Sequence, residues 1–245
     1  MAAPEQTDKP KGIEFYGGYE VYSESGVDLT LLRENLRRSV EERWNDACRG
    51  ATIFTAFRQP ASSNSHRKVG VSMFDASAII RRLTENHVEF VVVGGMAMIA
   101  RGSAHLTKDL DICYNRSPDN LPILVAALAP LHPYLRGAPP GLPFRFDAAT
   151  LKAGLNFTFI TDCGDLDLLG EVSGVGVYSH VLAQSSAETM FGMKVRVLSV
   201  DGLIAAKKAA GRNKDHAHLL ELIELKKILD AAKSTEDELD PASPA

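Results

Sequence analysis

One segment of this chain constrains its fold more than any other: a β-branched apolar run that ends in a double glycine. The run extends from Val88 to Val93 (VEFVVV), and Gly94-Gly95 follows it directly. β-Branched residues favour strands, and glycines allow a sharp turn with close approach of the backbone to a ligand. A short helix is expected next, over Met96 to Arg101. The segment predicts a strand–turn–helix unit whose helix N-terminus offers free N–H groups to a phosphate.

A second expected strand, Asp109 to Tyr114 (DLDICY), begins after 13 intervening residues. Residues i and i+2 of a strand point to the same face, so Asp109 and Asp111 are expected side by side, about 7 Å apart at Cα. Two neighbouring carboxylates repel each other unless a cation lies between them. Hard oxygen ligands on a rigid backbone suit Mg²⁺. The spacing therefore predicts a magnesium site beside a phosphate-binding turn.

A third carboxylate comes from an expected hairpin of residues 155–161 and 165–169, which turns at Cys163-Gly164. Asp167, between two leucines, would complete a site for two metals, one holding a triphosphate and the other activating a hydroxyl. Asp165 is the alternative third carboxylate, because it faces the same side of the strand. Since Asp165 follows the turn directly, it is expected to be more solvated, and Asp167 is preferred.

Together these motifs resemble the signature of the DNA polymerase β-like nucleotidyltransferase superfamily. The matching residues are Gly94-Gly95, Asp109-Leu110-Asp111-Ile112 and Leu166-Asp167-Leu168. The resemblance covers about residues 74–230. Three longer segments, at 92–112, 164–170 and 203–215, are similar to the bacterial branch with abortive-infection and toxin-type nucleotidyltransferases.

The resemblance implies an α/β (α+β) nucleotidyltransferase fold, with a mixed β-sheet, flanking helices and a C-terminal helical segment. It implies that Asp109, Asp111 and Asp167 ligate metal, with two Mg²⁺ ions expected and Mn²⁺ as a substitute. It also implies that Gly94 and Gly95 hold phosphate and that Lys207 contacts the nucleotide.

Further basic residues have two readings. Four positive charges lie close together, at Lys207, Lys208, Arg212 and Lys214. They form either a solvated helix end with favourable dipole placement or a clamp for phosphate or an RNA backbone.

Two further short segments contain polar or basic residues. Thr107 and Lys108 either orient phosphate beside the acid pair or only lead into the strand. His216 and His218 are expected on different sides of a helix, at the surface.

The implied activity is transfer of a nucleoside monophosphate from an NTP such as ATP to a hydroxyl acceptor, with release of pyrophosphate. The acceptor is tRNA, a protein or a small molecule, and the branch includes toxins of toxin–antitoxin pairs. A second class of function is an inactive nucleotide- or partner-binding module, on which Trp44 and Phe54 dock an antitoxin or a second copy. N-terminal helices that simply cover the core are the preferred alternative to that docking.

The expected organisation has six segments: a flexible N-terminus (1–26), a helical segment (27–60), a polar linker (61–72), a nucleotidyltransferase core (73–198), C-terminal helices (199–233) and a disordered tail (234–245). Within the second segment, Ser39 and Glu42 form an expected capping box at the start of a helix. The proline-rich stretch from Pro133 to Pro143 is expected to be a long loop.

Composition excludes several other classes. A net charge of -4 gives no overall basic field of the kind that nucleic-acid coat proteins carry. Three scattered cysteines are too few for a disulfide framework. The longest apolar stretch is half the length of a membrane span, and no secretory signal is visible, so the cytoplasm is expected. The sequence also lacks a P-loop and a G-x-G-x-x-G turn.

Overall fold

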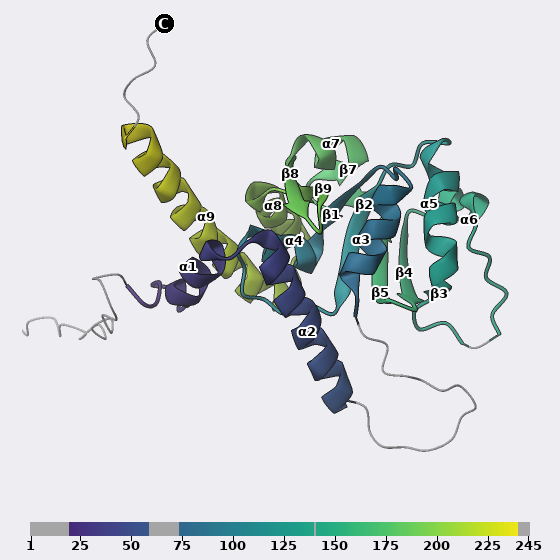
Figure 1. Cartoon of the computed structure of the whole chain (residues 1–245), viewed down its shortest axis with the longest axis horizontal. Helices are drawn as coiled ribbons and strands as arrows, with labels where there is room; N and C mark the ends of the chain where they lie inside the picture. Colours follow the sequence, from purple (N-terminus) through teal and green to yellow (C-terminus); the bar gives the residue numbers. More distant parts are fainter. Residues whose placement is uncertain (1–19, 59–73, 140, 240–245) are drawn as a thin grey trace, which may run out of the picture.

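The computed structural model describes residues 20–58, 74–139 and 141–239, without the side chains of 54–58, 213–214 and 235–239. The expectations for residues 1–19, for the linker at 61–72, for Phe54 and for the end of the tail lie outside this part of the chain. Across the described residues, a seven-stranded mixed sheet with the order β3-β4-β5-β2-β1-β9-β8 is surrounded by helices (Figure 1). The expected mixed sheet with flanking and C-terminal helices is confirmed.

The sheet consists of β1 (Phe90–Val93), β2 (Asp109–Tyr114), β3 (Tyr134–Leu135), β4 (Asn156–Thr161), β5 (Gly164–Leu169), β8 (Ser185–Met190) and β9 (Met193–Leu198). Two short strands, β6 (Glu171–Val172) and β7 (Gly176–Val177), form a separate pair. The helices are α1 (Leu29–Arg37), α2 (Val40–Arg58), α3 (Ala76–Glu85), α4 (Gly94–Arg101), α5 (Asn120–Leu128), the 3₁₀ turn η1 (Ala129–Leu131), α6 (Ala148–Ala153), α7 (Tyr178–Ala183), α8 (Val200–Ala210) and α9 (Asn213–Leu239).

The centre of the sheet is the most buried part of the molecule. All four residues of β1 are buried, as expected for a strand covered on both faces. β1 pairs antiparallel with β2 and parallel with β9, and β2 pairs parallel with β5. Leu110 and Ile112 of β2 are fully buried, whereas Asp109 and Asp111, on the other face, keep some exposure. The alternation in the sequence thus separates a core face from a polar face.

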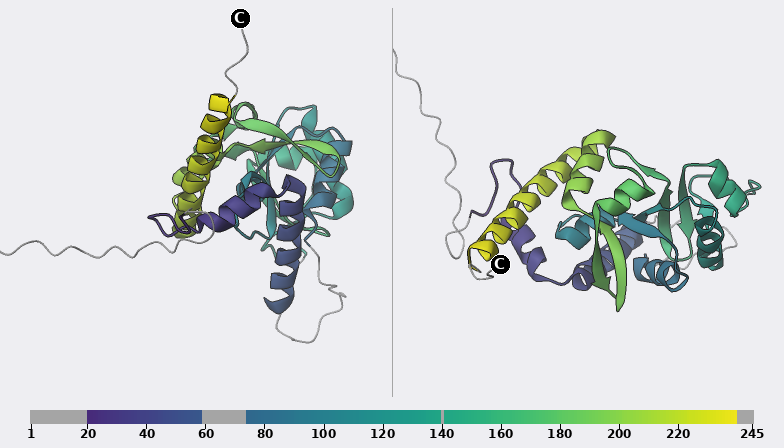
Figure 2. Two further views of the ribbon diagram at one scale, coloured as in Figure 1. Left: turned by 60° about the vertical axis from the view of Figure 1, so that its left-hand side comes forward. Right: turned by 90° about the horizontal axis from the view of Figure 1, so that it is seen from above.

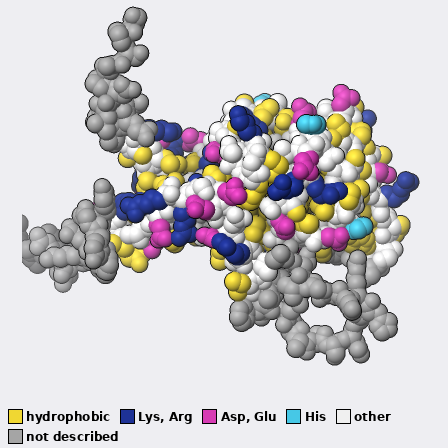
Figure 3. All heavy atoms as spheres, viewed as in Figure 1, with side chains coloured by type: hydrophobic (Ala, Val, Ile, Leu, Met, Phe, Trp, Pro, Cys, Tyr) yellow, Lys and Arg dark blue, Asp and Glu magenta, His cyan; other side chains and the backbone are white. Residues whose placement is uncertain are grey.

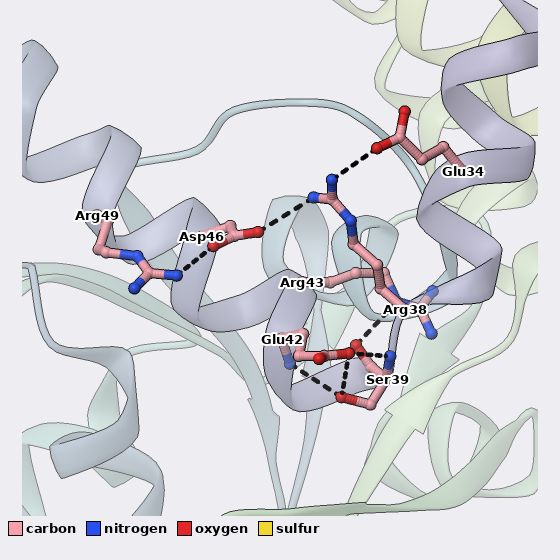
Figure 4. Close-up of polar contacts among 7 residues, drawn as sticks. All are labelled: Glu34, Arg38, Ser39, Glu42, Arg43, Asp46 and Arg49. Carbon is pink, nitrogen blue, oxygen red and sulfur yellow. Dashed lines mark hydrogen bonds and ion pairs between the residues drawn. The ribbon is translucent and has the colours of Figure 1, made fainter.

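Helix α2 is fixed to the sheet domain at its N-terminal end. The expected capping box is confirmed, because the Ser39 N–H donates to Glu42 Oε2 at 2.8 Å and the Glu42 N–H donates to Ser39 Oγ at 3.2 Å (Figure 4). One turn later, Trp44 is fully buried, and its Nε1 donates to the Met96 carbonyl oxygen at 3.0 Å. The interpretation of Trp44 as an exposed docking residue is therefore wrong. Its indole anchors α2 to α4, so this helix covers the core.

The last two described helices, α8 and α9, pack against each other at one end of the molecule. Helix α9 runs past α1 and extends beyond the sheet (Figures 1 and 2). It continues to Leu239, so the helix does not end at residue 233 as the sequence suggested. Among the described helices, none is both long and apolar enough to span a bilayer.

Candidate active site

The double glycine forms the start of α4, directly beside the acid strand. Gly94 has φ +62°, and a Cβ placed on it would lie 2.1 Å from Asp111 Oδ2. A Cβ on Gly95 would lie 2.7 Å from the Thr107 side chain. The Gly95 N–H donates to the Asp111 carboxylate. Glycine is therefore required here because the acid itself approaches the first turn of the helix.

The parallel pairing of β2 and β5 brings two acid pairs together. Asp111 lies opposite Asp167, and Asp109 lies opposite Asp165. Residues directly opposite each other on neighbouring strands share a face and are about 5 Å apart. The four carboxylates therefore form a block on the polar face of the sheet, with more negative charge in one place than either Asp-x-Asp pair has alone.

This concentration of acids changes the proton affinity of its members. The pKa of Asp111 is raised to about 7 by burial and by the charges of Asp109 and Asp167, which the Gly95 N–H and Lys207 only partly offset. Burial also raises the pKa of Asp167 to about 6, against the opposing effect of Arg136. Desolvation and like charges both penalise the ionised form, so the block favours a neighbouring cation.

A basic wall from the C-terminal helices faces these acids. Lys207 of α8 donates to Asp215 Oδ1 at 2.9 Å, and Arg212 Nε donates to Asp215 Oδ2 at 2.6 Å. Asp215 is only 2% exposed, and hydrogen bonds from Arg212 and Lys207 outweigh burial and hold its pKa well below the usual range. Lys207 and Arg212 are thus held in place by a buried acid, which a merely solvated helix end would not provide.

One cavity of about 670 Å³ is lined by the acids, the double glycine and the basic wall. Nine of the sequence-predicted site residues contribute to its lining: Gly94, Gly95, Thr107, Lys108, Asp109, Asp111, Asp167, Lys207 and Arg212. Lys214 belongs to α9, but its side chain lies outside the described part of the structure. Asp165 is not among the residues of the lining as described. A cavity of this size is typical of small-molecule sites.

Two other residues of the cavity lining were not predicted. Arg136 comes from the stretch expected to be a long loop, which instead contains the short strand β3, and it donates to both Asp165 and Asp167. His218 is half-buried in the cavity lining, with its ring centroid 3.9 Å from that of His105, so its interpretation as a surface residue is wrong. The sequence carried one usable signal, an acid at Asp215 just after the basic cluster, but none for Arg136.

One face of the molecule carries mixed surface charge. On the face shown in Figure 3, Lys and Arg side chains are interspersed with Asp and Glu rather than gathered in a stripe. This face therefore has no continuous basic stripe of the kind that a long nucleic-acid track needs.

Carboxylate oxygens are suitable ligands for a divalent metal, but in this structure the carboxylates contact other protein groups. Among the described residues, no three His, Cys, Asp or Glu side chains converge closely enough to hold an ion. Each predicted ligand has another partner instead: Asp109 accepts from Thr107 Oγ1, Asp111 from the Gly95 N–H, and Asp167 from Arg136. The mutual repulsion of the acids, and the close approach of Asp111 to the Gly94 turn, are the features that fit a cation.

The chain was compared with protein-family models, with curated proteins and with solved structures. No protein-family model and no curated protein matches the chain. The chain is similar to the solution structure of the antibiotic-resistance factor ANT(2'')-Ia, with 15% sequence identity and a TM-score of 0.38. The match covers 66% of this chain and 91% of that one. A likeness at this level does not assign an activity.

Proposed function

We propose that this chain is a metal-dependent nucleotidyltransferase that transfers a nucleoside monophosphate from an NTP to a hydroxyl. One observation carries the proposal. Asp111 and Asp167 lie opposite each other on parallel strands, next to the Gly94-Gly95 turn, and a basic wall faces them across one cavity. Paired acids for cations opposite fixed positive charges for phosphates are what NTP chemistry requires.

The acids would hold Mg²⁺ through Asp109, Asp111 and Asp167. When bound, the metal neutralises phosphate charge and lowers the pKa of the attacking hydroxyl. Two ions are expected, and Mn²⁺ would substitute for Mg²⁺.

The remaining residues bind and orient the nucleotide. Lys207 and Arg212, held by Asp215, contact the β- and γ-phosphates, and Lys108 and Thr107 lie at the rim beside Asp109. The acceptor oxygen forms a bond to the α-phosphorus, the bond from that phosphorus to the bridging oxygen breaks, and pyrophosphate leaves. The hydroxyl proton passes to a carboxylate of the acid block, and we assign it to Asp167.

The test is label transfer from [α-³²P]NTPs, offered singly, to a panel of tRNA, protein extract and small hydroxyl compounds. Wild-type protein is compared with Asp111→Asn, and with Asp119→Asn as a control that removes an exposed acid. The site variant should lose about 100-fold or more in rate, as when one charge-stabilising group is removed from an active site. Equal labelling by wild type and Asp111→Asn would show that the chemistry does not take place in this cavity.

A second candidate function is an NTP-binding module without turnover. The observation that favours it is the ion pair of Arg136 with Asp167, since a guanidinium already neutralises the third acid. NTP binding without transfer to any acceptor in the panel would support this alternative. The module would then be expected to bind an antitoxin-like partner or a second copy of this chain.

A further inference from the structure

Arg136 lies in line with the acids across the sheet. The Arg136 N–H donates to the Thr158 carbonyl oxygen at 2.9 Å, Thr158 pairs with Asp167, and Asp167 pairs with Asp111. Strands are about 4.8 Å apart, so a side chain that starts beside β4 must cross one strand to reach β5. Arginine is long enough for this, and its planar fork suits two carboxylates. Its Nη1 donates to Asp165 Oδ2 at 2.9 Å, and its Nη2 donates to Asp167 Oδ1.

This contact places a fixed positive charge on the carboxylate that a metal would need. The Asp167 side chain is 15% exposed and that of Arg136 is 28% exposed, so the pair is only partly screened by water. Burial opposes the charge on Arg136, but the neighbouring acids raise its pKa overall. Two cations close to one carboxylate repel each other, so the guanidinium and a metal ion cannot both occupy Asp167 at low cost.

The backbone that carries Arg136 lies at the edge of the sheet. β3 is an edge strand of two residues, and Arg136 follows it. Gly137 comes next, at φ +79°, with no atom within 4 Å of the position of a Cβ. A change of side-chain rotamer moves the guanidinium while the backbone hydrogen bond of Arg136 to Thr158 stays in place, so it can leave the acids without unfolding the sheet.

We propose that Arg136 is a built-in counter-ion that competes with a divalent cation for Asp167. In the metal-free protein it neutralises Asp165 and Asp167, and metal enters the third ligand position only as the guanidinium leaves. This inference rests on the proposed function, because it takes the acid block to be a metal site. Arg136 is thus a positioning residue, which sets the metal concentration at which the site assembles.

The test measures Mn²⁺ binding to the full chain without nucleotide, by calorimetry and by the electron paramagnetic resonance signal of free Mn²⁺. Arg136→Gln should bind Mn²⁺ about tenfold more tightly than wild type, as expected when one charge-assisted contact no longer has to be broken. Arg136→Lys should give an intermediate affinity, since an ammonium cannot bridge two carboxylates in the same planar geometry.

Removal of any positive charge near the acids will strengthen cation binding somewhat, so a charge-matched control is needed. Lys108→Gln provides it, because Lys108 lines the same cavity and forms no ion pair with Asp165 or Asp167 among the described contacts. Equal effects of Arg136→Gln and Lys108→Gln would overturn the proposal. A clearly larger effect of Arg136→Gln supports it.

A second measurement uses wild-type protein alone and does not depend on the folding of a variant. Phenylglyoxal modifies free guanidinium groups, and peptide mass spectrometry can follow Arg136 separately. Its modification should be slow without metal and faster with saturating Mn²⁺, whereas Arg212, held by Asp215, should change little. An unchanged rate at Arg136 would show that it does not leave the acids.

The outcomes separate this proposal from the proposed function. In one outcome, Asp111→Asn abolishes Mn²⁺ binding but Arg136→Gln does not change its affinity. That outcome overturns the counter-ion proposal and leaves the proposed nucleotidyltransferase site intact. Mn²⁺ binding that survives Asp111→Asn unchanged, or is absent from wild type, overturns both.

Discussion

Residue 94 is a glycine for two separable reasons, and each has its own free-energy cost. The positive φ favours glycine, and the short distance from a Cβ to the Asp111 carboxylate adds crowding. Gly211 also has a positive φ, +60°, but no atom lies within 4 Å of a Cβ placed on it. Only the backbone conformation therefore favours glycine at that position. The two positions form a matched pair that separates backbone strain from the cost of pushing an acid aside.

We expect Gly94→Ala to lower the free energy of unfolding more than Gly211→Ala does. Each change should cost about 1–2 kcal/mol for the left-handed backbone. Gly94→Ala should cost roughly 1–3 kcal/mol more, because its methyl group displaces the Asp111 side chain. Urea unfolding of both variants measures the difference. Similar losses would mean that Asp111 does not lie against the turn as described.

The acid block makes metal-free stability depend on pH. An acid with a higher pKa in the folded protein than in the unfolded chain binds its proton more tightly when folded, so the free energy of unfolding falls as pH rises between the two values. For Asp111 this window runs from about 4 in the unfolded chain to about 7 in the folded protein.

Metal-free wild type should therefore lose stability relative to Asp111→Asn as the pH is raised from 4 to 7. Asn keeps the shape of the side chain but cannot ionise, so the variant lacks this contribution. Unfolding in urea with EDTA, at several pH values, gives the difference curve. A curve that is flat or rises with pH contradicts the block of interacting acids.

Asp215 should be required for both stability and phosphate binding. Asp215→Asn leaves Lys207, whose side chain is 14% exposed, without its acid, and loss of one member of a buried ion pair costs about 3–5 kcal/mol. Thermal unfolding measures the loss. The exposed pair of Asp201 and Lys226 is the control, since Asp201→Asn should cost less than about 1 kcal/mol. Equal losses would argue against a buried scaffold for the basic wall.

At the scale of elements, the sequence predicts those with a strong hydrophobic period. The strands β1, β2, β4 and β5 follow from alternation or from β-branched runs, and α2 starts at the capping box that its sequence indicates. By contrast, β8 (SSAETM) buries only Met190 and has no apolar alternation of its own. Its strand conformation depends on pairing with β9, which a local pattern does not contain.

Helix α2 depends on Trp44, the single tryptophan of the chain. Trp44→Ala should cost about 3–5 kcal/mol, and Trp44→Phe clearly less, because the ring volume is largely kept. The wild-type indole should emit at short wavelength in the folded protein and shift to longer wavelength on unfolding. The fluorescence transition should coincide with loss of helical circular dichroism. An earlier fluorescence transition would show that α2 detaches before the sheet unfolds.

At the scale of the whole molecule, the cavity connects the sheet to the C-terminal helices. Under the proposed function, an NTP with Mg²⁺ bound there would contact both parts and stabilise the folded state by about 2.7 kcal/mol at 100 times its Kd. For a chain of this length that corresponds to a rise in Tm of roughly 5–10 °C. Differential scanning calorimetry should show this rise with NTP and Mg²⁺ together, and little with either alone. Asp111→Asn should abolish it, and Asp119→Asn should not.

The sequence predicts the residues of the candidate site whose positions depend on strand geometry. It does not predict those whose positions depend on packing between distant segments. Asp109 and Asp111 share a face by the two-residue period, and Asp167 follows from the expected hairpin. The contact of Arg136 requires the order β3-β4-β5, which fixes how far the edge strand lies from the acids. The buried state of Asp215 and the pairing of His105 with His218 likewise depend on how α8 and α9 pack, which no local spacing states.

The parallel register of β2 and β5 also decides when the site forms during folding. Parallel neighbours cannot be joined by a tight turn, so Asp111 meets Asp167 only after a long intervening segment has folded into place. Pairings between distant segments form slowly, because loop-closure entropy is lost before the contacts are gained. During synthesis, β1, α4 and β2 leave the ribosome long before β5, and α8 and α9 follow later still. Until β5 has been made, a nascent chain carries only the Asp109–Asp111 half of the acid block, and the basic wall joins it once α8 and α9 have folded into place.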